Sequence, residues 1–162
     1  MKKAFLFLSV FLFLIGMVHS QDSDTCEWGG TVRFKPLPAV LGLFSGIVSV
    51  TMDWVPYVTP NVGIPVELDF AAAGGVAGFG IYTGLEGAIG RKEKNGLFLA
   101  ALAGPMFING KVYFAAKSDI GYQLVTDRGF VFTPAVGFKF SNLTGFGLDY
   151  MLDIGFAYKK RH

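Results

Sequence analysis

The chain has 162 residues, of which 52% are hydrophobic, 15% aromatic and only 16% charged. Soluble domains usually carry charge on about a quarter of their residues, so this composition is unusual for one, although the length fits a single domain. The 14 basic residues include Lys2 and Lys3, and without these two the chain has 12 basic and 12 acidic residues. A zero formal charge excludes the clustered basic excess of a nucleic-acid-binding protein.

The first twenty residues have the layout of a secretory signal peptide. Lys2 and Lys3 form a positive start, residues 4–18 are uncharged and apolar, and residues 18–20 offer a cleavage site before Gln21. An uncleaved membrane helix is the alternative, but the apolar run of about 15 residues is shorter than the roughly 20 that a bilayer requires. We therefore expect a signal peptide at 1–20 and an exported domain at 21–162.

The exported domain offers no helix that could span a membrane. No charge-free run of 18 or more residues with helical character follows residue 18, and the stretch 71–85 is Gly-rich and too short. A membrane protein without membrane helices has one remaining architecture, the closed β-barrel, because lipid leaves no partner for an unpaired backbone group.

The N-terminal half of the exported domain has the period-two alternation that predicts β-strands. The strands expected here are 28–36, 47–55, 64–70 and 79–86. Residues 37–45 are apolar but unpatterned, and a strand continuation, a tight apolar loop and a lumen-blocking segment all fit them. Pro56, Pro65 and Pro134 each lack a ladder donor and are expected at bulges or strand ends.

The C-terminal half repeats the pattern more clearly. The strands expected here are 96–108, 112–124, 130–140 and 146–158. The first of them is apolar on both faces, so its assignment depends on its position between the charged turn 91–95 and Asn109-Gly110. Short turn signals separate the others, which predicts hairpins. The total is eight strands, and an even number places both termini on the same side of a membrane barrel.

The two faces of these strands differ in a way that predicts which one points inward. One face is large, aromatic and free of charge, whereas the other is rich in Gly and Ala and carries the charges. Small residues suit the narrow interior of an eight-stranded barrel. A charge facing lipid near the midplane would cost roughly 2–4 kcal/mol. We therefore predict an all-β fold, an eight-stranded antiparallel up-and-down transmembrane β-barrel with its apolar face outside.

The charged face supplies a candidate network inside the lumen. It consists of Arg33, Lys35, Asp53, Glu67, Asp69, Glu86, Lys117, Asp119, Lys139, Asp149 and Asp153. Four positive and seven negative groups indicate mutually paired charges that close the lumen, because buried charges require hydrogen-bonded partners. An ion or small-solute path is the functional alternative.

Seven outward aromatic residues lie near the expected strand ends, as in the aromatic girdles of membrane proteins. These membrane-interface candidates are Trp28, Trp54, Phe70, Phe130, Phe140, Phe146 and Tyr158.

Residues that carry catalytic or metal chemistry are scarce. His162 is the one histidine left after cleavage. The chain therefore lacks the histidine that commonly serves as a general base and the ligands that a zinc site needs. Cys26 cannot form an intramolecular disulfide, and the polar residues before it disfavour lipidation. Asp149 and Asp153 share a face but lie about 13 Å apart along their strand. We expect no enzyme, no metal and no cofactor.

The chain end from Asp153 to Tyr158 (Asp-Ile-Gly-Phe-Ala-Tyr) resembles that of small outer-membrane barrels of the OmpX/OmpW type. The phrases at 57–63 and 121–125 look like those of small barrels in spirochaetes and related diderms. The polar-x-Gly-aromatic ending is similar to the signal read by the barrel-assembly machinery, although residues 159–162 follow the last aromatic here. The resemblance implies passage of small hydrophobic compounds (OmpW type) or adhesion (OmpX type), and the short loops disfavour adhesion.

The sequence therefore predicts a monomeric, mainly structural barrel in the outer membrane of a diderm bacterium, with lipid and the assembly machinery as partners and with passage of small hydrophobic solutes as an option. The alternative is a soluble, secreted, lipocalin-like barrel that binds a hydrophobic ligand in an apolar lumen.

Overall fold

The computed structural model describes residues 28–37, 40, 44, 46–59, 61–92, 95–126 and 128–159, with the side chains of residues 28, 90–92 and 159 left aside. The expected signal peptide, Cys26, part of the turn 91–95 and the tail 160–162 lie outside the described residues. The strands are β1 (Trp28–Phe34), β2 (Ile47–Thr59), β3 (Val62–Gly63), β4 (Val66–Ala73), β5 (Val76–Lys92), β6 (Asn95–Ile108), β7 (Lys111–Val125), β8 (Phe130–Ser141) and β9 (Gly145–Lys159).

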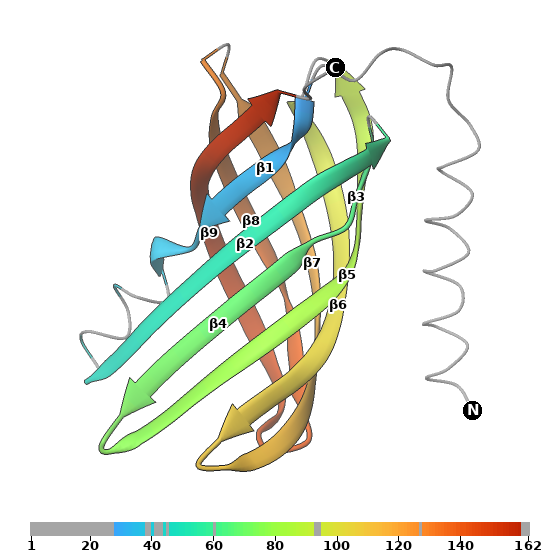
Figure 1. Cartoon of the computed structure of the whole chain (residues 1–162). Coiled ribbons are helices and arrows are strands. Elements are labelled where there is room, and N and C mark those ends of the chain that lie inside the picture. Colours follow the sequence, from blue (N-terminus) through green and yellow to red (C-terminus); the bar gives the residue numbers. More distant parts are fainter. Residues whose placement is uncertain are drawn as a thin grey trace, which may run out of the picture.

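These strands form one closed antiparallel barrel (Figure 1). Apart from β3 and β4, which do not pair with each other, each strand pairs with its chain neighbours, and β1 pairs with both β2 and β9, which closes the sheet. The short β3 and the longer β4 both lie between β2 and β5, so together they occupy one position in the wall. The nine segments thus form eight staves with up-and-down connectivity, which confirms the predicted all-β, eight-stranded antiparallel up-and-down barrel.

The barrel has two ends that differ in their connections. β1 begins and β9 ends at the same end, at the top of Figure 1, which we call the terminal end. The opposite, far end carries the turns at 74–75, 109–110 and 142–144. The first two are tight hairpins with positive φ at both central residues, 56° and 82° at Gly74-Gly75 and 48° and 75° at Asn109-Gly110. Such angles match the right-handed twist of the strands, and Asn-Gly is a strong signal for them.

The prolines interrupt the wall as expected at one position and not at another. Pro65 lies in the break between β3 and β4, as predicted for a residue without a ladder donor. Pro134 lies well inside β8, contrary to the prediction. It pairs in register with Leu152 of β9, while the β7–β8 register passes from Gly121 opposite Ala135 to Leu124 opposite Phe132. The wall tolerates this proline because the β7–β8 pairing lapses there.

The connection from β1 to β2 is not a continued strand at the positions that the structure describes. Pro36, Leu37, Val40 and Phe44 have helical backbone. Phe44 is 88% exposed, so this side chain does not block the lumen. Among the described residues, none of the helical segments has the length and apolar character needed to cross a membrane.

Candidate functional site: the barrel interior

Side chains on the two faces of the wall alternate along most of the strands, and β8 shows this most clearly. Val131, Thr133 and Ala135 are buried, whereas Phe132 and Val136 between and beside them are exposed. The alternation follows from the pleat, which sends successive side chains to opposite faces. All eleven charged candidates have the inward parity; Asp69, Lys139 and Asp149 are half-buried and the others are buried.

Arg33 is the centre of one ion cluster. Its Nη2 donates to Asp53 Oδ2 at 2.5 Å and to Glu86 Oε2 at 2.7 Å, and its Nε donates to Asp53 Oδ2 at 3.0 Å. Asp153 Oδ2 lies 3.8 Å from Nε, and Nη1 donates to Gln123 Oε1 at 3.4 Å. These partners come from β2, β5, β9 and β7, so one guanidinium from β1 links opposite sides of the lumen. Such multiple hydrogen bonds compensate the burial of a charge.

A second cluster links three lysines through two carboxylates. Lys35 Nζ lies 2.6 Å from Glu67 Oε2, and Lys117 Nζ donates to the other oxygen of the same carboxylate. Lys117 also lies 3.4 Å from Asp69 Oδ2, which Lys139 approaches at 3.2 Å. Glu67 is fully buried, so its two carboxylate oxygens are not hydrated, and the hydrogen bonds from the two lysines replace that hydration. The three ammonium groups and two carboxylates extend the network toward the far end.

Two of the expected acids are not joined to either cluster. Within the described part of the chain, Asp119 and Asp149 form no ion pair, and Asp119 Oδ1 is buried without a hydrogen-bond partner. Asp119 faces Gly137 across the β7–β8 ladder, and a Cβ at Gly137 would collide with that carboxylate oxygen. A glycine at 137 is therefore what leaves room for the Asp119 side chain.

Uncharged residues that the candidate set missed complete the interior. Thr51 Oγ1 donates to Asp69 Oδ1 at 2.7 Å, Gln123 Nε2 donates to Tyr57 Oη at 3.0 Å, and Lys35 Nζ lies 2.9 Å from Met151 Sδ. The Lys117 ammonium lies 4.4 Å from the centre of the Tyr82 ring. Strand parity alone could have found most of them, because they alternate in phase with the charges.

The outward aromatic residues lie toward the two ends of the barrel. Trp54, Phe70, Phe130, Phe140, Phe146 and Tyr158 are all exposed, and the side chain of Trp28 lies outside the described residues. Trp54 Nε1 donates to Tyr158 Oη at 2.9 Å near the terminal end. Phe140 and Phe146 flank the far-end turn 142–144, with ring centroids 5.3 Å apart.

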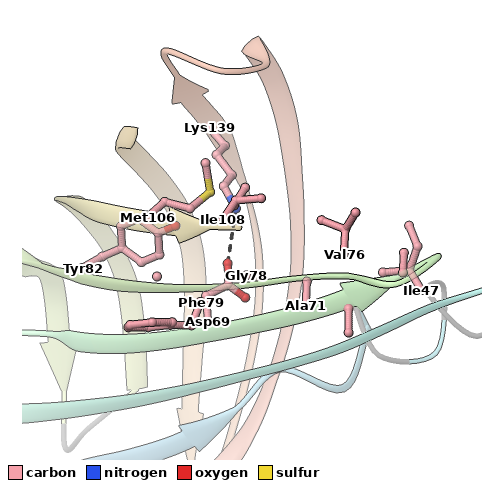
Figure 2. Close-up of a pocket in the computed structure, with 13 residues that line it drawn as sticks. Ile47, Asp69, Ala71, Val76, Gly78, Phe79, Tyr82, Met106, Ile108 and Lys139 are labelled. Atoms are coloured by element: carbon pink, nitrogen blue, oxygen red, sulfur yellow. Dashed lines mark hydrogen bonds and ion pairs between the residues drawn. The ribbon is translucent and has the colours of Figure 1, made fainter. Parts of the chain in front are cut away.

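The interior changes from charged to apolar beyond Asp69, where a cavity of about 280 Å³ lies at the far end (Figure 2). Its walls come from β2, β4, β5 and β6, and Lys139 reaches it from β8. The lining residues are Ile47, Asp69, Ala71, Ala72, Ala73, Val76, Gly78, Phe79, Gly80, Tyr82, Met106, Ile108 and Lys139. The Lys139–Asp69 ion pair is the dashed contact in Figure 2.

No group of three or more His, Cys, Asp or Glu side chains that could hold a metal ion occurs among the described residues. Comparisons with protein-family models, with curated proteins and with solved structures find no match to this chain. The closed eight-stranded antiparallel architecture is compatible with a small β-barrel protein.

Proposed function

We propose that this protein is an integral outer-membrane β-barrel of a diderm bacterium, mainly structural and without enzymatic activity. The observation that carries the proposal is the inverted distribution of side chains. Large apolar residues cover the outside of the barrel, and the charges lie inside it. Lipid is the medium that makes such an arrangement stable.

The outward surface supports this proposal by its extent. Phe146, Leu148 and Phe156 are each more than 60% exposed, and large apolar side chains are exposed on every stave. Soluble monomers rarely expose contiguous apolar patches larger than a few hundred Å². In water, a surface of this kind would cause aggregation. In lipid, exposing these apolar side chains carries no such free-energy cost.

The height of the apolar surface also fits a bilayer. Along β8 the outward series runs from Phe130 to Phe140, ten residue steps. At about 3.3 Å per residue and a tilt of roughly 40°, this corresponds to a height of about 25 Å, the height of the apolar band of outer-membrane barrels. Trp54 and Tyr158, which bond to each other near one end of the band, are residues typical of the membrane interface.

The soluble lipocalin-like alternative requires an apolar lumen and a polar exterior. The middle of this lumen instead holds Arg33, Lys35 and Lys117 with their carboxylate partners. Buried apolar residues such as Phe98, Leu102 and Met151 pack among these charges, so the lumen is not the continuous apolar cavity of a lipocalin-like barrel, which supports the membrane proposal over the soluble one.

Passage of small hydrophobic solutes is the second candidate, and the far-end cavity is the observation that favours it. A solute that entered there would meet the Lys139–Asp69 pair and then the two ion clusters. Passage therefore requires the network to open. Uptake of an apolar dye into vesicles that contain the protein, against empty vesicles, tests this candidate.

Cell fractionation tests the leading proposal. We expect the full chain in the outer-membrane fraction, extractable only with detergent, and an unboiled sample should migrate differently from a boiled one on a denaturing gel. The same experiment tests export through residues 1–20, since the mature protein should begin at Gln21. Recovery from the aqueous periplasm without detergent would contradict the membrane proposal and favour the lipocalin-like barrel.

A further inference from the structure

The far-end cavity differs from the rest of the interior, because its walls are apolar although they face the lumen. Ile47, Ala71, Val76, Met106 and Ile108 all have inward parity. The first three lie beyond the last charged residue of their strands, and β6, which carries Met106 and Ile108, has no charged residue. The interior of a membrane barrel is ordinarily polar. A concave apolar surface that ends in a few polar groups is the usual form of a small-molecule site, and about 280 Å³ is near the lower limit for one.

The polar groups at the floor of the cavity have spare donors, on the Lys139 ammonium and on the Tyr82 hydroxyl, which has no hydrogen-bond partner among the described residues. Among the described residues, Lys139 bonds to Asp69 and lies 5.9 Å from the Tyr82 ring centre, and its side chain is 34% exposed. An ammonium group has three donors, so two remain for another partner. Asp69 is already engaged by Thr51, Lys117 and Lys139. A ligand that carries an acceptor group would therefore find free donors at the floor of the cavity.

The charges of this cluster point to the same partner chemistry. Lys35, Lys117 and Lys139 share the carboxylates of Glu67 and Asp69, which leaves one ammonium in excess. Asp149, the other half-buried acid toward this end, forms no ion pair with the cluster among the described residues and does not line the cavity. Lys139 is the ammonium of this cluster that lines the cavity.

We infer that the cavity binds a small amphipathic monocarboxylate, with its carboxylate on Lys139 and its short aliphatic chain between Ala71, Met106 and Ile108. The unbranched Met106 adapts to a flexible chain. The head group would complete the charge balance of the cluster, and the tail would cover apolar wall that otherwise faces water. The inference depends on the barrel interior alone and holds in either medium, so it goes beyond the proposed membrane role.

The methionines provide a direct test. Met106 lines the cavity, whereas Met52 is 49% exposed on the outer face. With ¹³C-methyl-labelled methionine and the full mature chain in lipid nanodiscs, added octanoate should shift the Met106 signal saturably and leave Met52 unchanged. Octyltrimethylammonium, with the same tail and the opposite charge, should not shift Met106. A shift of Met52 alone would mean that octanoate only partitions into lipid, and it would overturn the inference, as would equal Met106 shifts with both probes.

Variants separate the head-group contact from general electrostatics. Lys139→Gln should weaken octanoate binding by about tenfold or more, as expected for loss of a charge-assisted hydrogen bond. Lys139→Arg should retain most of the affinity. Lys111→Gln, an exposed lysine at the same end that does not line the cavity, is the matched control and should bind as the wild type does. Equal losses for Lys111→Gln and Lys139→Gln would refute the site.

A cavity-filling variant keeps the test decisive if Lys139→Gln fails to fold. Ala71→Leu places its side chain in the space proposed for the aliphatic tail and should abolish the Met106 shift. An undiminished Met106 response in Ala71→Leu would overturn the inference. If fractionation instead finds the barrel in the aqueous periplasm, the same titration is done in buffer, so the failure of one proposal does not decide the other.

Discussion

At the scale of single residues, the Glu67 carboxylate joins two lysine side chains across the lumen, Lys35 through one oxygen and Lys117 through the other. Alternation assigns Glu67 and Lys117 to the same face, because the period of a strand is two. It does not say that the Glu67 carboxylate bridges Lys35 and Lys117, since those contacts cross the lumen between strands that are far apart in sequence. The barrel closure that brings them together is a property of the whole sheet.

Glu67 offers a residue-scale prediction of stability. Glu67→Gln removes the negative charge shared by Lys35 and Lys117 and leaves two ammonium groups undercompensated inside the barrel. Removing one partner of a buried ion pair typically costs about 3–5 kcal/mol. Guanidinium unfolding of the refolded barrel should show a loss of this order. Arg128→Gln in an exposed turn is the control and should change stability by less than about 0.5 kcal/mol.

The double variant Glu67→Gln with Lys35→Met decides whether the loss comes from unpaired charge. Removing one of the two ammonium groups should restore part of the stability, so the two changes should be strongly non-additive. Additive losses would show that the Lys35–Glu67 contact contributes little.

A substitution at Val136 tests whether the outer face of the barrel contacts lipid or water. Val136 is 53% exposed and lies near the middle of the outward series of β8. In lipid, Val136→Lys places a charge near the midplane and should destabilise the barrel by about 2–4 kcal/mol. In a soluble barrel the same surface change would stay within about 0.5 kcal/mol. Leu143→Lys, in the exposed far-end turn, is the control. Unfolding in lipid vesicles that affects both variants equally would contradict a lipid-facing Val136.

At the scale of elements, the strands were predictable where one face is polar and less so elsewhere. β7, β8 and β9 extend the expected strands 112–124, 130–140 and 146–158 by only a residue or so. The break between β3 and β4 was missed, because Ile64 continues the apolar alternation although its strand has ended there. The sequence did not decide what residues 37–45 form, because an apolar stretch without a period specifies no element. The structure has helical backbone at Leu37, Val40 and Phe44.

The hairpin turns carry the element-scale prediction. Gly110 has a φ of 75°, in the left-handed region that disfavours residues with a Cβ. Gly110→Ala should therefore destabilise the barrel by about 1–2 kcal/mol through strain in the β6–β7 turn. Gly147→Ala is the matched control, because a Cβ there approaches only Lys139 O, at 4.0 Å, and Gly147 does not have a left-handed φ. Unfolding midpoints that fall equally in both variants would argue against turn strain.

At the scale of the whole molecule, the sequence predicted a filled lumen, and the structure identifies the side chain that spans it. Arg33 contacts Asp53 of β2, Glu86 of β5 and Gln123 of β7, with Asp153 of β9 nearby. No other described side chain has ionic and hydrogen-bonded partners on so many staves. Arg33 thus connects staves on opposite sides of the lumen.

These contacts predict how the lumen conducts. The wild-type barrel in a planar bilayer should show no stable ion conductance, because the Arg33 side chain and its partners from four staves meet inside the lumen. Arg33→Ala should open a path and make it cation-selective, since Asp53, Glu86 and Asp153 lose their shared positive partner. Lys139→Ala removes a half-exposed lysine at the far end and leaves the Arg33 cluster intact, so it should stay closed. If Arg33→Ala is folded by the gel-shift criterion and still does not conduct, the obstruction lies elsewhere, and the cluster of Lys35, Glu67 and Lys117 is then the barrier to test.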